Sequence, residues 1–154
     1  MDSGLNALNS DVIPSGYVID ASVGIKLFVI EEGSDQALDL FNRLTSEPPV
    51  IFYVPDYFYA ECANVLWKYV QYYGYDAESA RQDLEDLRGL ALLSIPTADL
   101  IAPAFELALA YDLTIYDACY LALARLVSLP LATADVKMTE KAAESEVKIQ
   151  LIAQ

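Results

Sequence analysis

Four acidic residues stand where one predicted element gives way to the next. Asp20 directly follows a short apolar run, Asp135 follows another, and Glu61 and Asp117 fall in the first turns of two predicted helices. Parallel sheets bind ligands outside the carboxyl ends of their strands, and helices that leave those ends begin at the same edge. We therefore expect the four carboxylates to lie together at one edge of a sheet.

A cluster of this kind needs a cation. Two carboxylates about 4 Å apart repel each other by roughly 4 kcal/mol at an effective dielectric constant of about 20. Four carboxylates stay ionised only with a cation between them, and an all-oxygen set prefers Mg²⁺ or Mn²⁺ to Zn²⁺. Such a site suits phosphoryl chemistry, in which an activated water attacks in line and a carboxylate takes its proton.

The residue types and motifs that the sequence lacks exclude several classes of active site. The chain has no histidine, which excludes Ser-His-Asp and Cys-His arrangements and the HExxH zinc site. The sequence contains neither GxGxxG nor GxxxxGK[ST], so the usual dinucleotide and P-loop phosphate sites are excluded too. Cys62 and Cys119 form no CxxC pair, and we predict two buried thiols rather than a disulfide.

Each acid also has a structural alternative. Asp20 and Asp135 could cap the helices that follow them, and Glu61 could be a solvated residue favoured by the helix dipole. The segment from Thr114 to Asp117 resembles a capping box, so Asp117 could serve the helix end alone. These alternatives stay open for each residue taken singly, whereas the joint placement favours a shared site.

The hydrophobic pattern predicts an α/β protein. Short and fully apolar runs are typical of parallel strands buried on both faces, and segments of helical periodicity separate them. We predict strands at 17–19, 50–54, 92–95, 130–133 and 147–152, and helices at 22–30, 37–44, 56–73, 76–90, 98–112, 115–127 and 139–145. We expect Ser22 and Asp56 to be helix N-caps. The expected architecture is a three-layer α/β/α sandwich with a parallel sheet.

The length favours one domain. Residues 1–16 are rich in Asn, Ser, Asp and Gly, and we interpret them as a flexible N-terminal tail before a single domain at 17–154. The sequence has no run of about 18 apolar residues and no secretory signal, so we expect no membrane association and a cytoplasmic location.

Charge is strongly unbalanced. Nine Lys and Arg against 23 Asp and Glu give a net charge of −14. Such a chain repels nucleic acid at long range, because affinity for phosphate comes from Lys and Arg. Lys26, Lys68 and Lys137 are the basic residues nearest the predicted edge in the sequence. We expect each to be a solvated surface lysine, with phosphate contact as the alternative.

Four segments together resemble one known family. They are YVIDAS (17–22), AECANVLWK (60–68), TIYDACYLALA (114–124) and LATADVK (131–137). In this order and spacing they resemble the PIN-domain ribonucleases, most of all the VapC-type toxins of prokaryotic toxin–antitoxin pairs. The resemblance covers about residues 17–152 and implies the strand order 3-2-1-4-5. It also implies cleavage of RNA with Mg²⁺ or Mn²⁺, leaving a 5′-phosphate and a 3′-hydroxyl.

The resemblance implies a role for each site residue. Asp20 and Asp117 would be the firmest metal ligands, Asp135 would complete the metal site, and Glu61 would orient or deprotonate the attacking water as a further acid of that site. Thr133 would hold a water or an acid in place. The implied partners are an RNA substrate, a second copy in a homodimer and a cognate antitoxin protein whose tail lies across the site.

Two other functions are open to a chain of this pattern. One is a catalytically weak or inactive PIN-like protein-binding module. The other is a phosphoacceptor or phosphatase on a similar sheet, but Asp20-Ala21-Ser22 lacks the second Asp of a DxD element. A dense aromatic cluster is predicted to be core plus a dimer or antitoxin interface, with stacking on RNA bases as the alternative. It comprises Phe52, Tyr53, Tyr57, Phe58, Tyr59, Trp67, Tyr69, Tyr72 and Tyr73.

Overall fold

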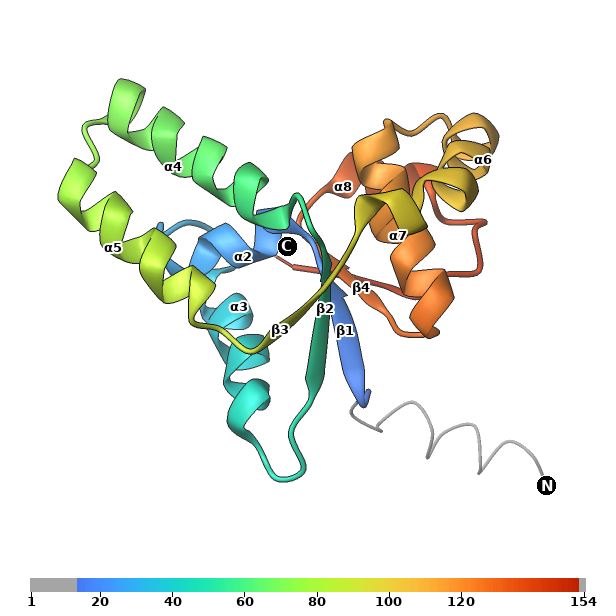
Figure 1. The fold of residues 1–154 in the computed structure, drawn as a ribbon, viewed down its shortest axis with the longest axis horizontal. Coiled ribbons are helices and arrows are strands. Elements are labelled where there is room, and N and C mark those ends of the chain that lie inside the picture. The colour runs from blue at the N-terminus through green and yellow to red at the C-terminus, as the bar shows by residue number, and fades with distance from the viewer. Residues whose placement is uncertain (1–13, 153–154) are drawn as a thin grey trace.

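A computed structural model describes residues 14–152 as a parallel five-stranded sheet in the order β3-β2-β1-β4-β5 (Figure 1). The strands are β1 (Gly16–Ile19), β2 (Ile51–Pro55), β3 (Leu92–Ile95), β4 (Leu131–Thr133) and β5 (Ile149–Leu151). The predicted fold class and strand order are confirmed. The predicted tail falls mainly on residues 1–13, which lie outside the described residues together with the last two residues of the chain.

Helices cover both faces of the sheet (Figure 1). One layer contains α2 (Ala21–Gly24), α3 (Ser34–Phe41), α4 (Phe58–Tyr73) and α5 (Ala77–Arg88). The other contains α6 (Ile101–Tyr111), α7 (Ile115–Val127) and α8 (Val136–Lys141). Successive residues of a strand point to opposite faces. Accordingly, Tyr17 and Ile19 of β1 join the core of the first layer, whereas Val18 joins the core of the second.

The central position of β1 brings the elements of the site together. β1 pairs with β2 on one side and with β4 on the other, so the carboxyl ends of the three strands lie side by side. On α2, Gly24 allows close packing against α4, because a Cβ at this position would lie 2.7 Å from the ring of Phe58. On the opposite face, α7 buries seven consecutive residues, from Ala118 to Ala124.

Several helices that follow a strand begin at other residues than predicted. α2 begins at Ala21 with Asp20 as its N-cap residue, and its predicted cap, Ser22, lies inside the helix. After Gly24 the chain tightens into a 3₁₀ turn at Ile25–Leu27, so the helix predicted at 22–30 is shorter. The predicted helix 139–145 is observed as α8, because the side chain of Asp135 accepts a bond from the backbone N–H of Met138 and starts the helix earlier.

A further cap prediction fails at α4. Tyr57, not Asp56, is the N-cap residue of this helix, and no side chain caps it. The carboxylate of Asp56 accepts instead from the hydroxyl of Thr97, just after β3. Asp56 therefore links two neighbouring strand ends rather than the helix start.

The prediction of a solvated surface lysine is wrong for Lys26. Its side chain is only 7% exposed, and its ammonium donates to Oε1 of Glu31 and to the carbonyl of Glu32, both at 2.8 Å. The hydroxyl of Tyr69 on α4 donates to the other oxygen of Glu31 at 3.1 Å. A lysine is buried only when it is paired, and here its partners come from the next loop. Lys68 and Lys137 are exposed, as predicted.

The predicted buried thiols are observed, and the aromatic cluster belongs in part to the core. Cys62 and Cys119 are both buried and free. Of the aromatic cluster, Phe52 and Phe58 are fully buried, whereas α4 exposes Trp67, Tyr72 and Tyr73. Among residues 14–152 no single helix is long and apolar enough to cross a membrane, and only α6 and α7 taken together, with a bend of 113° between them, pass on length and composition.

Candidate functional site

One pocket of about 270 Å³ lies at the carboxyl ends of the strands and collects all four predicted acids. Asp20 comes from the end of β1, Asp135 from the segment after β4, Glu61 from α4 and Asp117 from the first turn of α7. The remaining lining residues are Ala21, Ser22, Asn64 and Val65. The convergence expected from the strand ends is therefore observed.

Asp20 is fixed by two hydroxyl donors. Its Oδ2 accepts from Oγ of Ser22 and from Oγ1 of Thr133, each at 2.7 Å. Its backbone N–H donates to the carbonyl of Ala132 at 3.0 Å, which continues the pairing between β1 and β4. The hydroxyl of Thr133 also accepts from the backbone N–H of Asp135 at 3.1 Å. Thr133, which is fully buried, thus positions two of the four acids.

Ser22 is a site residue that the sequence analysis assigned only to a helix cap. Its hydroxyl donates to Asp20, and it accepts from the backbone N–H of Ala134 at 3.0 Å. Ser22 therefore ties the end of β1 to the segment after β4. The spacing between Asp20 and Ser22 could have predicted this role, because a short hydroxyl side chain two residues after an aspartate readily hydrogen-bonds to its carboxylate.

Tyr120 was missed altogether. Its side chain is completely buried, and its hydroxyl donates to Oε1 of Glu61 at 2.6 Å and accepts from the backbone N–H of Ala21 at 3.3 Å. A buried tyrosine generally needs a partner for its hydroxyl. The signal in the sequence was therefore one phenol within the apolar stretch 118–124 of α7, three residues after Asp117.

The capping alternative holds for Asp135, and for Asp117 only in part, because the side chain that caps α7 is that of Thr114. Oδ1 of Asp135 accepts from the backbone N–H of Met138 at 2.9 Å and so caps α8. Thr114 caps α7 by accepting from the backbone N–H of Asp117 at 3.2 Å. Neither role removes an acid from the pocket, because both Asp117 and Asp135 line it. Capping instead holds their backbones in place.

The acids share an unfavourable electrostatic environment. Burial raises the pKa of Asp20, and the charge of Asp135 adds to that effect. Burial raises the pKa of Glu61 to about 6, with a smaller contribution from the charges of Asp20 and Asp117. Burial also raises the pKa of Asp117 to about 6, followed by the charges of Asp20 and Asp135, whereas Lys141 acts in the opposite direction. Each carboxylate therefore lies within electrostatic reach of others, and a cation would stabilise all of them.

The donor set fits a hard divalent cation. Within residues 14–152 no group of three acidic or cysteine side chains is arranged so that it could enclose a metal ion directly. Mg²⁺ does not require such a cage, since it keeps several waters and is commonly held by one or two carboxylates. A pocket lined by four carboxylates meets that requirement. That all four acids take part stays a prediction.

A second pocket of about 370 Å³ adjoins the first and shares Asp117 and Asp135 with it. Its other lining residues are Asp112, Leu113, Thr114, Lys137, Met138 and Lys141. This region joins the acidic edge to the lysines of α8. In this pocket, two of the four predicted acids and two lysines line the same surface.

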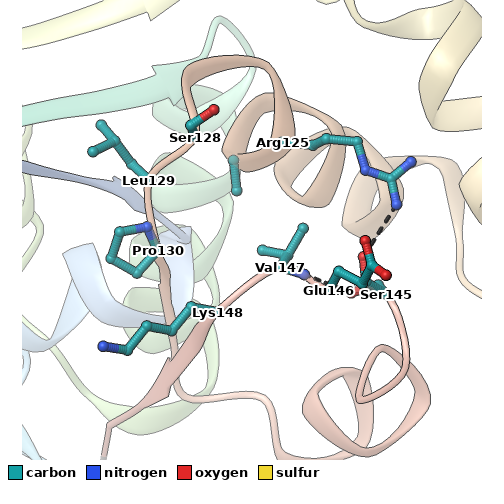
Figure 2. A pocket seen from close by; sticks show the side chains of 9 residues that line it. Arg125, Ser128, Leu129, Pro130, Ser145, Glu146, Val147 and Lys148 are labelled. Carbon is teal, nitrogen blue, oxygen red and sulfur yellow. Dashed lines mark hydrogen bonds between the residues drawn. The ribbon is translucent and has the colours of Figure 1, made fainter. Parts of the chain in front are cut away.

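A larger pocket, of about 480 Å³, lies at the opposite end of β4 and β5 (Figure 2). It is lined by Arg125, Lys148 and the segment around Ser145, and Arg125 donates to the carbonyl of Ser145 at 3.1 Å. Glu146 is its single acid. One exposed carboxylate provides no metal site, so the size of this pocket does not make it the reactive centre.

Comparisons with known proteins identify the family of the chain. The model of the PIN domain family matches residues 17–144. Ribonuclease VapC3 from Pyrobaculum aerophilum is 36% identical over 126 residues, which cover 80% of this chain and 92% of that protein. The crystal structure of PAE2754 from Pyrobaculum aerophilum has a TM-score of 0.63 at 20% identity, over 87% of this chain and 82% of the other. A toxin–antitoxin complex from Klebsiella pneumoniae has a TM-score of 0.57 at 22% identity, over 82% of this chain and 90% of the matched chain.

Proposed function

Because the chain belongs to the PIN domain family, we propose that it is a metal-dependent ribonuclease, the toxin of a toxin–antitoxin pair, which hydrolyses phosphodiester bonds of RNA. The observation that carries the proposal is the single pocket at the carboxyl ends of β1 and β4, in which four acids from separate parts of the chain meet. The similarity to Ribonuclease VapC3 supports RNA as the substrate.

In this proposal the acids hold Mg²⁺ or Mn²⁺. Asp20 and Asp117 are the principal ligands, and Asp135 and Glu61 complete the site directly or through water. When bound, the ion would polarise a phosphate oxygen and lower the pKa of a water. Ser22 and Thr133 keep Asp20 oriented toward the pocket, since both hydroxyls bind its Oδ2.

Glu61 takes the proton of the attacking water. Its Oε1 is held by Tyr120 at 2.6 Å, which leaves the other carboxylate oxygen for the proton. A base with a pKa of about 6 is ionised near neutral pH and still accepts a proton readily. The water oxygen bonds to phosphorus as the bond from phosphorus to the 3′ oxygen breaks. The 3′ oxygen takes up a proton from solvent, so the products carry a 5′-phosphate and a 3′-hydroxyl.

The proposed partners follow from charge and exposed surface. A chain with a net charge of −14 attracts a basic polypeptide, and α4 exposes Trp67, Tyr72 and Tyr73 for contact with one. The matched toxin–antitoxin complex supports a cognate antitoxin as that partner. A homodimer, a single domain over 17–154 and a cytoplasmic location belong to the same proposal.

The test measures cleavage of a pool of short single-stranded RNAs of random sequence with Mg²⁺ or Mn²⁺, and counts new 5′-phosphate ends. We expect Asp20→Asn and Asp117→Asn each to lose more than about 100-fold in rate, because changes in the shell outside metal ligands already cost about 10–100-fold. Asp39→Asn is the matched control, since Asp39 is an exposed carboxylate on α3 outside the pocket. Calorimetry with Mn²⁺ should show binding to the parent and to Asp39→Asn and much weaker binding to Asp117→Asn.

Two results would contradict the proposal. If both site variants cut as fast as the parent, the four acids are not the reactive site. If the parent neither cuts RNA nor binds a divalent ion, the chain is an inactive PIN-like protein-binding module, for which the exposed aromatics of α4 would provide the surface.

A further inference from the structure

The basic residues of this chain are few, and most of them are already engaged. All nine lie within the described residues. Four form ion pairs with carboxylates, namely Lys26, Arg81, Arg88 and Lys141. Arg43 donates to the hydroxyl of Tyr17, and Arg125 donates to a backbone carbonyl. Within residues 14–152, no polar partner is found for the remaining three, Lys68, Lys137 and Lys148.

Of these three lysines, Lys137 alone lines a pocket that shares residues with the acidic site. The adjoining pocket of about 370 Å³ contains Lys137 and Lys141 together with Asp117 and Asp135. This volume falls within the range of about 300–1,000 Å³ that is typical of ligand pockets. Lys137 is the second residue of α8, which starts directly after Asp135. The exposed ammonium forms no ion pair with either acid.

We propose that Lys137, with Lys141 beside it, binds the RNA phosphate next to the one that is cleaved. This inference rests on the proposed function. RNA that reaches the acidic pocket is repelled by a chain of net charge −14, and affinity for a phosphate backbone requires a local cation. The adjoining pocket supplies that cation outside the acidic pocket, because Lys137 lines the former and not the latter.

Lys141 has a second role that separates it from Lys137. Its ammonium donates to the carbonyl of Asp112 at 2.9 Å and lies 3.4 Å from the carboxylate of the same residue. Lys141 therefore fastens α8 to the turn between α6 and α7, and removing it would disturb the pocket wall. Lys137 forms no such bond, so a change there reports on the ligand alone.

The opposite end of the sheet supplies the control. Lys148, like Lys137, is exposed and has no ion pair with any residue that the structure describes, but it lines the pocket of Figure 2 at the amino ends of β4 and β5. Figure 2 shows the side chains of Lys148 and Arg125 directed away from each other, so they do not form a shared anion site. Lys148→Gln removes the same unit of charge from the same protein without changing the adjoining pocket.

The experiment compares Lys137→Gln, Lys137→Arg and Lys148→Gln. Cleavage of the random RNA pool by each variant gives kcat/KM. In a separate measurement, each variant is combined with Asp20→Asn to prevent cutting, and the anisotropy of the fluorescein-labelled pool gives Kd at several salt concentrations. For Lys137→Gln we expect a Kd about fivefold higher. The slope of log Kd against the logarithm of the salt concentration should fall by about 0.7, the value for one phosphate contact of a single strand. Lys137→Arg should retain most of the affinity, and Lys148→Gln should change Kd less than about twofold.

The outcomes distinguish the inference from the proposed function. If the parent cuts RNA and Lys137→Gln matches Lys148→Gln in Kd and in salt dependence, the phosphate subsite is wrong and the nuclease stands. If the parent binds RNA without cutting it, the nuclease fails and the same Kd comparison still decides the subsite. If the parent neither cuts nor binds the pool, both fail.

Discussion

The hydroxyl of Tyr120 donates a 2.6 Å hydrogen bond to Oε1 of Glu61, across 59 residues of sequence and between helices on opposite faces of the sheet. The same hydroxyl accepts from the backbone N–H of Ala21, directly after Asp20. One buried phenol therefore contacts both the residue proposed as the base and the helix start that follows a principal metal ligand. Tyr120 is a positioning residue, since it acts through Glu61.

Replacing Tyr120 with Phe should slow RNA cleavage about tenfold, as expected when a bond that orients an active-site carboxylate is lost. Because that bond lowers the pKa of Glu61, its removal should also move the acid limb of the pH profile of kcat/KM to higher pH. Rates measured across the acid range check both effects.

The control for Tyr120→Phe is Tyr72→Phe, which removes a phenol hydroxyl from an exposed side chain of α4. That variant should keep the rate and the pH profile of the parent. A Tyr120→Phe enzyme that is less stable but has an unchanged pH profile would show that Tyr120 supports the fold and does not position Glu61.

Metal-free protein should become more stable on mild acidification. The folded-state pKa values of Glu61 and Asp117 are raised to about 6, so the folded state binds protons that the unfolded chain takes up only below about pH 4. The free energy of unfolding therefore rises as the pH falls from about 7 to about 5, by about 1 kcal/mol for each group after allowance for solvent screening. Thermal unfolding in EDTA measures this rise.

Asp117→Asn tests the cause of that pH dependence. An amide carries no charge, so the variant should be more stable than the parent at neutral pH without metal, and the two should converge near about pH 5. Added Mg²⁺ should reverse the order at neutral pH, because a ligand that binds the folded state stabilises it. Equal stability of parent and variant at all pH values would argue against the repulsion inferred between the acids.

Thr133 allows a test of the hydroxyl network that holds Asp20. Thr133→Val keeps the shape of the side chain but removes the donor to Asp20 and the acceptor for the N–H of Asp135. We expect a loss of about 2 kcal/mol in the free energy of unfolding and a clear loss of RNA cleavage. Thr133→Ser keeps the hydroxyl and should restore most of the cleavage rate. A Val variant as active as the Ser variant would show that the hydroxyl is dispensable.

The sequence was sufficient to predict where Asp20 and Asp135 lie, because a short apolar run followed by an acid marks the carboxyl end of a buried strand. The same reasoning placed Glu61 and Asp117, each near the start of a helix that leaves this edge. The Tyr120 bond could not be predicted in this way. It depends on how closely α7 and α4 approach the end of β1, and periodicity gives the buried face of each helix but not that distance.

Local competition between bonds explains the errors at helix ends. Ser22 and Asp56 are suitable caps by residue type, yet each binds a group that is distant in the sequence, Ser22 the N–H of Ala134 and Asp56 the hydroxyl of Thr97. Such a partner exists only after the sheet has formed. Cap preference describes an isolated helix, so it fails where neighbouring strand ends offer another donor.

Lys26 provides the last prediction, because its burial contradicts the sequence-based expectation most strongly. Replacing it with Met leaves the carboxylate of Glu31 and the carbonyl of Glu32 without their cation, and we expect a loss of about 3 kcal/mol in the free energy of unfolding. Lys68→Met makes the same change at an exposed position of α4 and should stay within about 0.5 kcal/mol of the parent. Urea unfolding of both variants measures the difference. Equal midpoints would mean that Lys26 reaches solvent and that its pair with Glu31 adds nothing to stability.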